Sequence, residues 1–119
     1  MGFLFSRPAS PHGTTTLQRA HSLLDDHALQ AAHALLLPLP AWPPSPEWMT
    51  AVHRLLCLLH QAGDLAGAVE VGQQCVRGRQ AVLGPGHHET VASLLVLSVA
   101  LLEADRGQEA LQSCRQCVR

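Results

Sequence analysis

The chain has 119 residues, with eight Arg and no Lys against nine Asp and Glu, so its formal net charge is −1. This balance provides no cationic surface for nucleic acid, and two Phe, two Trp and no Tyr offer few platforms on which bases could stack. The longest apolar run, residues 91–102, is shorter than the roughly 20 residues of a membrane span. We therefore expect no nucleic-acid partner, no membrane partner, and a soluble protein of the cytoplasm or the nucleus.

The four cysteines, Cys57, Cys75, Cys114 and Cys117, follow no secretory signal pattern, because the apolar start at residues 1–5 is too short. A reducing compartment is expected, where free cysteines pack as small apolar residues. Cys114 and Cys117 have the C-x-x-C spacing of thiol oxidoreductases, but no strand is predicted before them. We interpret them as packing residues.

Residues 1–16 combine Pro, Gly, Ser and Thr without periodicity, which predicts a disordered leader. Its first residues fit the short pattern for N-myristoylation at Gly2, although no second membrane signal accompanies it. Apolar residues then recur at helical spacing from Leu17. They predict a helical hairpin over residues 17–37, which Pro38 stops.

A second hairpin is predicted over residues 47–83 and a third over residues 88–119. Ser45 suits the N-cap position before the second hairpin, and Pro46 suits the first helical position. Gly63 and Asp64 supply its turn, and Asp64 can cap the helix that follows. Since no segment alternates as a strand would, the sequence predicts an all-α domain of antiparallel helical hairpins over residues 17–119.

The tetrapeptide at residues 74–77 returns unchanged at residues 116–119, an offset of 42 residues. The same offset matches four further pairs: Leu55 with Leu97, Leu59 with Leu101, Ala62 with Ala104, and Ala68 with Ala110. Helical repeats of this length bury their apolar faces on neighbouring repeats, so a stacked binding scaffold is expected. Because the second copy ends the sequence inside a repeat, we expect a fragment or isoform whose C-terminal helix can self-associate.

The spacing from Gly63 to Ala68, with Cys75 as a second small residue, resembles the tetratricopeptide repeat family. Residues 83–90 resemble the L-G-x-x-H-P-x-T linker of its 42-residue subclass, typified by kinesin light chains, with His88 in place of the proline. Helix lengths over residues 63–111 also resemble the C-terminal domain of SET-and-MYND-domain lysine methyltransferases. The resemblance implies a right-handed stack with a concave groove.

In the register of the tetratricopeptide repeat family, the first helix of each hairpin lines a groove that binds a peptide or helix of another protein. The resemblance assigns nine residues to this surface: Thr50, His53, Cys57, His60, Gln61, Leu95, Val99, Leu102 and Glu103. The groove would change from polar and titratable to apolar along the stack. The expected function is therefore non-catalytic protein–protein interaction.

Two alternatives use the same residues. The chain could be the helical tail of a SET-and-MYND-type methyltransferase, without its catalytic core. It could also be a metal-binding helical domain, because His53, Cys57 and His60 share one helix face at i, i+4 and i+7. A fourth ligand, a nucleophile elbow and a phosphate loop are all missing from the sequence, so we expect no cofactor and no enzyme.

Overall fold

The computed structural model of the chain describes residues 14–117. This part of the chain forms six helices and no strand, which confirms the predicted all-α class. The helices are α1 (Thr14–Asp25), α2 (Leu29–Leu36), α3 (Pro46–Gln61), α4 (Leu65–Leu83), α5 (His88–Glu103) and α6 (Gly107–Cys117). Helix α1 includes residues 14–16, which the sequence had placed in the leader, while residues 1–13 with the Gly2 motif lie outside the described residues.

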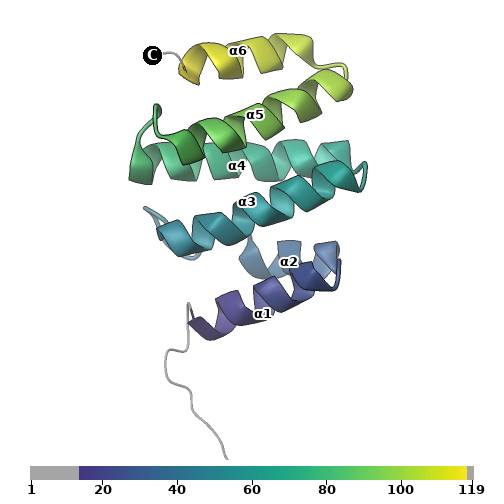
Figure 1. Ribbon diagram of the computed structural model, residues 1–119, viewed down its shortest axis with the longest axis vertical. Coiled ribbons are helices and arrows are strands. Elements are labelled where there is room, and N and C mark those ends of the chain that lie inside the picture. The colour runs from purple at the N-terminus through teal and green to yellow at the C-terminus, as the bar shows by residue number, and fades with distance from the viewer. Residues whose placement is uncertain (1–13, 118–119) are drawn as a thin grey trace, which may run out of the picture.

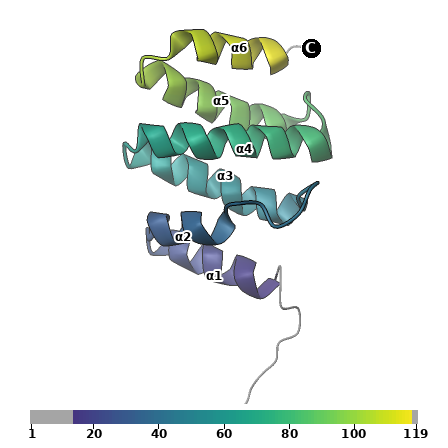
Figure 2. The ribbon, with the colours of Figure 1, turned by 180° about the vertical axis from the view of Figure 1, so that it is seen from behind.

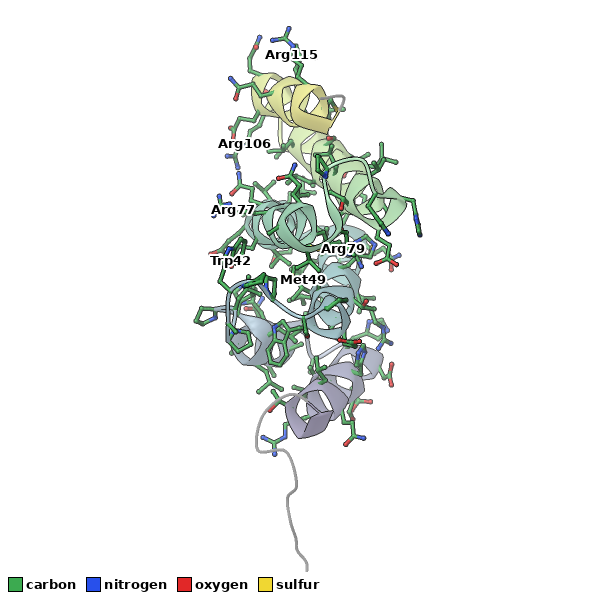
Figure 3. The ribbon with its side chains drawn as sticks, turned by 90° about the vertical axis from the view of Figure 1, so that its left-hand side faces the viewer. Trp42, Met49, Arg77, Arg79, Arg106 and Arg115 are labelled. Atoms are coloured by element: carbon green, nitrogen blue, oxygen red, sulfur yellow. The ribbon has the colours of Figure 1, made fainter. Side chains whose placement is uncertain are left out.

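The helices form one elongated stack of three antiparallel hairpins, 56 × 28 × 19 Å along its principal axes (Figure 1). Viewed from behind, α2 and α4 come to the front (Figure 2). Seen edge-on, α1, α3 and α5 occupy one side of the stack and α2, α4 and α6 the other (Figure 3). The first helices of the three hairpins therefore share one face, as the family resemblance implied.

The helix starts follow the capping residues that the sequence offered. The Ser45 side chain accepts a hydrogen bond from the Trp48 backbone N–H at 3.1 Å, and Pro46 occupies the first turn of α3. The Asp64 carboxylate accepts from the Gly67 N–H at 3.0 Å at the start of α4. These bonds satisfy backbone donors that have no partner inside the helix, which confirms both predicted N-caps.

All three hairpin turns have the same backbone geometry. One residue in each turn has a positive φ: His27 at 57°, Gly63 at 82° and Asp105 at 64°. The N–H of the next residue reaches back to the helix, as from Asp64 to the Leu59 carbonyl at 3.0 Å. The same bond joins Arg106 to Leu101 at 2.7 Å and Ala28 to Leu23 at 2.8 Å. This left-handed cap ends each first helix in the same way, although glycine occupies only one of the three positions.

The core confirms the register of the 42-residue repeat. Leu55 and Leu59 of α3 are buried, as are their equivalents Leu97 and Leu101 of α5. Ala68 and Ala110, which the 42-residue offset pairs with each other, are 0% and 4% exposed. A third alanine, Ala32 of α2, is fully buried at the corresponding place, which extends the pattern to the first hairpin. Side chains this small let the paired helices approach closely.

The first hairpin departs from the repeat because α2 has only eight residues, whereas α4 has 19. Pro38 follows the C-cap of α2 and prevents continuation of the helix. Trp48 of α3 packs at this end, 6% exposed, and donates its indole N–H to the Leu36 carbonyl at 3.0 Å. This bond satisfies a carbonyl at the end of the short helix.

Candidate functional site

The predicted groove residues lie on α3 and α5, which pack against each other on one face of the stack. On α5, Leu95, Val99 and Leu102 are 59%, 41% and 61% exposed. They follow the i, i+4, i+7 spacing, so they form one row on the helix surface, which we call the α5 ridge. Three large aliphatic side chains in a row are an exposed apolar surface of the kind that proteins use for contact.

The polar residues of α3 beside the ridge fall into two groups. Thr50 and Gln61, near the two ends of the helix, are exposed. His53 and Cys57 are half-buried and contact each other, with His53 Nε2 at 3.4 Å from Cys57 Sγ. The other ring nitrogen of His53, Nδ1, lies 2.8 Å from Ser93 Oγ of α5. His53 therefore links the two helices as well as bordering the surface.

Ser93 is the centre of a polar cluster between α3, α4 and α5. Its hydroxyl oxygen accepts a hydrogen bond from Arg79 Nη1 at 3.0 Å and lies 3.2 Å from Cys75 Sγ. Arg79 Nη1 also donates to the Glu89 carbonyl at 2.9 Å, and its Nη2 lies 3.7 Å from the Glu89 carboxylate. Arg79 is only 5% exposed and lies inside the stack, whereas Arg77, Arg106 and Arg115 lie at its surface (Figure 3).

The single hydroxyl proton of Ser93 limits how the hydrogen bonds of this cluster are shared. Ser93 has one proton to donate and accepts from Arg79, so one of His53 and Cys75 receives the Ser93 proton and the other donates to Ser93. Burial, and then the charge of Arg79, lower the pKa of His53. Burial raises the pKa of Cys75 to about 11 and also raises the pKa of Cys57. Both thiols are therefore protonated near neutral pH and are poor nucleophiles and metal ligands.

His60 and Glu103 form a contact at the end of the face, with His60 Nε2 at 2.9 Å from Glu103 Oε1. Glu103 holds the ring of His60 against α5. His60 is therefore not positioned to bind one metal ion together with His53 and Cys57. Among residues 14–117, no three His, Cys, Asp or Glu side chains are grouped so that they could hold a metal ion. The geometry of the described residues therefore does not support the metal-binding alternative.

Cys114 stands apart from this cluster. It is exposed, so the packing role predicted for it is wrong, and its Sγ lies 3.4 Å from Ser98 Oγ of α5. The side chain of Cys117 lies outside the described part of the chain, so its predicted packing role stays a prediction. A small cavity of about 260 Å³ lies at the hairpin turns and is lined by His27, Leu29, Leu58, Gln61 and Ala62.

Sequence reasoning missed Arg79 and Ser93, which organise the cluster. The signal for Arg79 was its position, since it lies eleven and four residues after Ala68 and Cys75 and so shares their buried face. Charged residues are almost never fully buried unless paired, which made a surface position the default expectation. Ser93 carried no signal of its own, because a serine within an apolar helix is equally compatible with exposure.

No helix among the described residues is long and apolar enough to cross a membrane. Neither the curated proteins nor the solved structures that were compared with the chain gave a match. The family model described as tetratricopeptide repeat matches residues 51–89, about a third of the chain. The matched segment contains most of α3, all of α4 and the turn between them. Proteins of this kind are typically non-catalytic and bind other proteins, and the match supports a tetratricopeptide repeat family for this chain.

Proposed function

We propose that the chain is a non-catalytic interaction module that binds a peptide or an amphipathic helix of another protein on the shared face of α3 and α5. The observation that carries this proposal is the α5 ridge, because Leu95 and Leu102 expose more than half of their surface in the folded chain. An amphipathic partner helix could place its own apolar i, i+3, i+4 and i+7 residues on this row. The partner would thereby remove apolar surface from water.

The polar residues beside the ridge would fix the orientation of the bound partner. Thr50, Gln61 and the His60–Glu103 pair border the face with exposed or half-exposed donors and acceptors. His53 and Cys57 contribute less surface, since their side chains are half-buried and face Ser93 and each other. We therefore expect the α5 ridge to supply affinity, and the α3 residues to fix the orientation of the partner.

A rigid stack supports this function energetically. The Arg79 cluster connects α3, α4 and α5, so the face is already formed before a partner arrives. A preformed surface loses little conformational entropy on binding, whereas a flexible loop would have to become ordered. The same face could instead pack on a catalytic domain, as the methyltransferase-tail alternative requires.

The test is selection of short displayed peptides on the full chain, followed by binding measurements with variants. Enriched peptides should carry apolar residues at helical spacing, and Leu95→Glu with Leu102→Glu should weaken their binding by about tenfold or more. Leu111→Glu on α6 is the matched control, because Leu111 is 48% exposed outside the ridge. Peptides that bind the ridge variant as tightly as the wild type would exclude this face as the binding surface.

A further inference from the structure

The interface between α4 and α5 contains two buried side-chain atoms that form no hydrogen bond with any residue of the described chain. They are Nε of Arg79, a residue that is 5% exposed, and Oγ1 of Thr90, a residue that is fully buried. An unpaired polar atom away from water is costly, so in a folded protein it calls for a partner such as a bound water or ion. The two atoms therefore indicate a ligand inside the stack.

The two unpaired atoms belong to the same part of the interface. Arg79 Nη1 donates to the Glu89 carbonyl at 2.9 Å and to Ser93 Oγ at 3.0 Å. Thr90 follows Glu89 in the chain and precedes Ser93 by three residues, so Thr90 and Ser93 lie on the same face of α5. The guanidinium of Arg79 therefore contacts α5 directly before Thr90 and again one turn after it.

The backbone N–H of Thr90 adds a third polar group at this place. Thr90 is the third residue of α5, and the N–H groups of the first helical residues have no partner within the helix. The Glu89 N–H donates to His87 Nδ1 at 3.1 Å, and the Val91 N–H donates to the His87 carbonyl at 2.9 Å. The N–H of Thr90, which lies between them, forms no such bond within residues 14–117.

The chemistry of these groups defines which ligand fits them. Arg79 Nε and the Thr90 N–H can only donate hydrogen bonds, whereas the Thr90 hydroxyl can donate or accept. A water molecule can accept from both N–H groups and donate to the hydroxyl oxygen, which gives it three partners, the typical number for a buried water. An anion could also accept from these donors. However, the Glu89 carboxylate, 3.7 Å from Arg79 Nη2, already provides a countercharge for the guanidinium.

We propose that one water molecule is bound between α4 and α5, where it joins Arg79 Nε to the hydroxyl and the N–H of Thr90. Close packing of the two helices favours this small ligand, since a Cβ placed on Gly72 of α4 would lie 2.9 Å from Leu97 Cδ1 of α5. The water completes the hydrogen bonds of the buried Arg79 and holds the first turn of α5 against α4. Because the site lies inside the stack, it is independent of the proposed binding face.

Thr90→Val tests the proposal through the sign of its effect on stability. Valine and threonine have similar helix propensities, so the substitution mainly removes the hydroxyl. If a water joins Thr90 to Arg79, the loss of one of its partners should lower the melting temperature of the full chain by about 4 °C or more. If the hydroxyl has no partner at all, valine should raise the melting temperature. Thr50→Val is the control, because Thr50 is exposed and its Oγ1 donates to the Pro46 carbonyl of its own helix.

Oxygen-17 relaxation dispersion detects the water directly, because it counts long-lived internal water molecules and does not respond to hydroxyl protons. The wild type and Thr90→Ser, which keeps the hydroxyl, should each show one more such water than Thr90→Val. A wild type without a long-lived water, an equal count in Thr90→Val, or a raised melting temperature for Thr90→Val would overturn the proposal. A stability difference between the wild type and Thr90→Val that grows with chloride concentration at constant ionic strength would identify an anion as the ligand and would also refute it.

Discussion

Replacement of Ser93 by alanine tests whether the buried cluster holds α3, α4 and α5 together. The variant removes one oxygen that lies within hydrogen-bonding distance of Arg79, His53 and Cys75. The bond to the charged guanidinium is worth about 1.5–3 kcal/mol, and a half-buried imidazole nitrogen loses its partner in addition. Since Arg79 keeps its bond to the Glu89 carbonyl, we expect a total loss of about 2–3 kcal/mol in the free energy of unfolding. Urea denaturation followed by circular dichroism at neutral pH would measure it.

Ser98→Ala is the matched control for this experiment. Ser98 lies on the same helix and is 5% exposed, but among the described residues its hydroxyl forms only the contact to Cys114 Sγ at 3.4 Å. Both substitutions gain the same helix propensity from alanine, so that contribution cancels when the two are compared. If Ser93→Ala costs no more than Ser98→Ala, the cluster is incidental. In an Arg79→Met background, Ser93→Ala should lower the free energy of unfolding by about 1–2 kcal/mol less than it does in the wild type. Methionine carries no charge, so removal of Ser93 then leaves no buried charge without a partner.

Two further predictions concern pH and packing. The lowered pKa of His53 means that, as pH falls below about 7, the unfolded chain binds a proton that the native chain resists. The free energy of unfolding should therefore decrease on acidification, and His53→Gln should reduce the slope in urea titrations at several pH values; equal slopes would contradict this role. Gly72→Ala places a Cβ against Leu97 and the Leu56 side chain, so it should lower stability by about 1–3 kcal/mol, with Gly86→Ala in open space as the control.

Much of the fold could be predicted from the sequence because its signals act over a few residues. Ser45 and Asp64 cap the helices that follow them, and the 42-residue offset places Leu97 and Leu101 in the core. The sequence did not predict that the three hairpin turns share one backbone conformation. His27 and Asp105 adopt the left-handed conformation that Gly63 adopts, and neither residue type indicates this conformation as strongly as glycine does.

The candidate site could be predicted only in part. The exposure of Leu95, Val99 and Leu102 is compatible with the contact surface that the register assigned to them. His53 was placed on the same surface, but its bond to Ser93 joins residues 40 positions apart in the chain. A contact of that range depends on how α3 and α5 pack, and the spacing of residues within one helix does not contain this information.

The sequence by itself determined the all-α class, the N-caps of α3 and α4, and the buried apolar residues of the 42-residue repeat, although it misplaced the start of α1. Capping, helical periodicity and repeat spacing could be used in this way because they are local properties of the chain. Only the tertiary structure decided which polar residues are buried and which are exposed. Arg79 is buried where Glu89 and Ser93 of the next hairpin accept hydrogen bonds from its Nη1, and Cys114 is exposed although its equivalent Gly72 is covered. The physical reason is that burial of a polar or small side chain depends on what a neighbouring helix places opposite it, and that neighbour comes from a distant part of the chain.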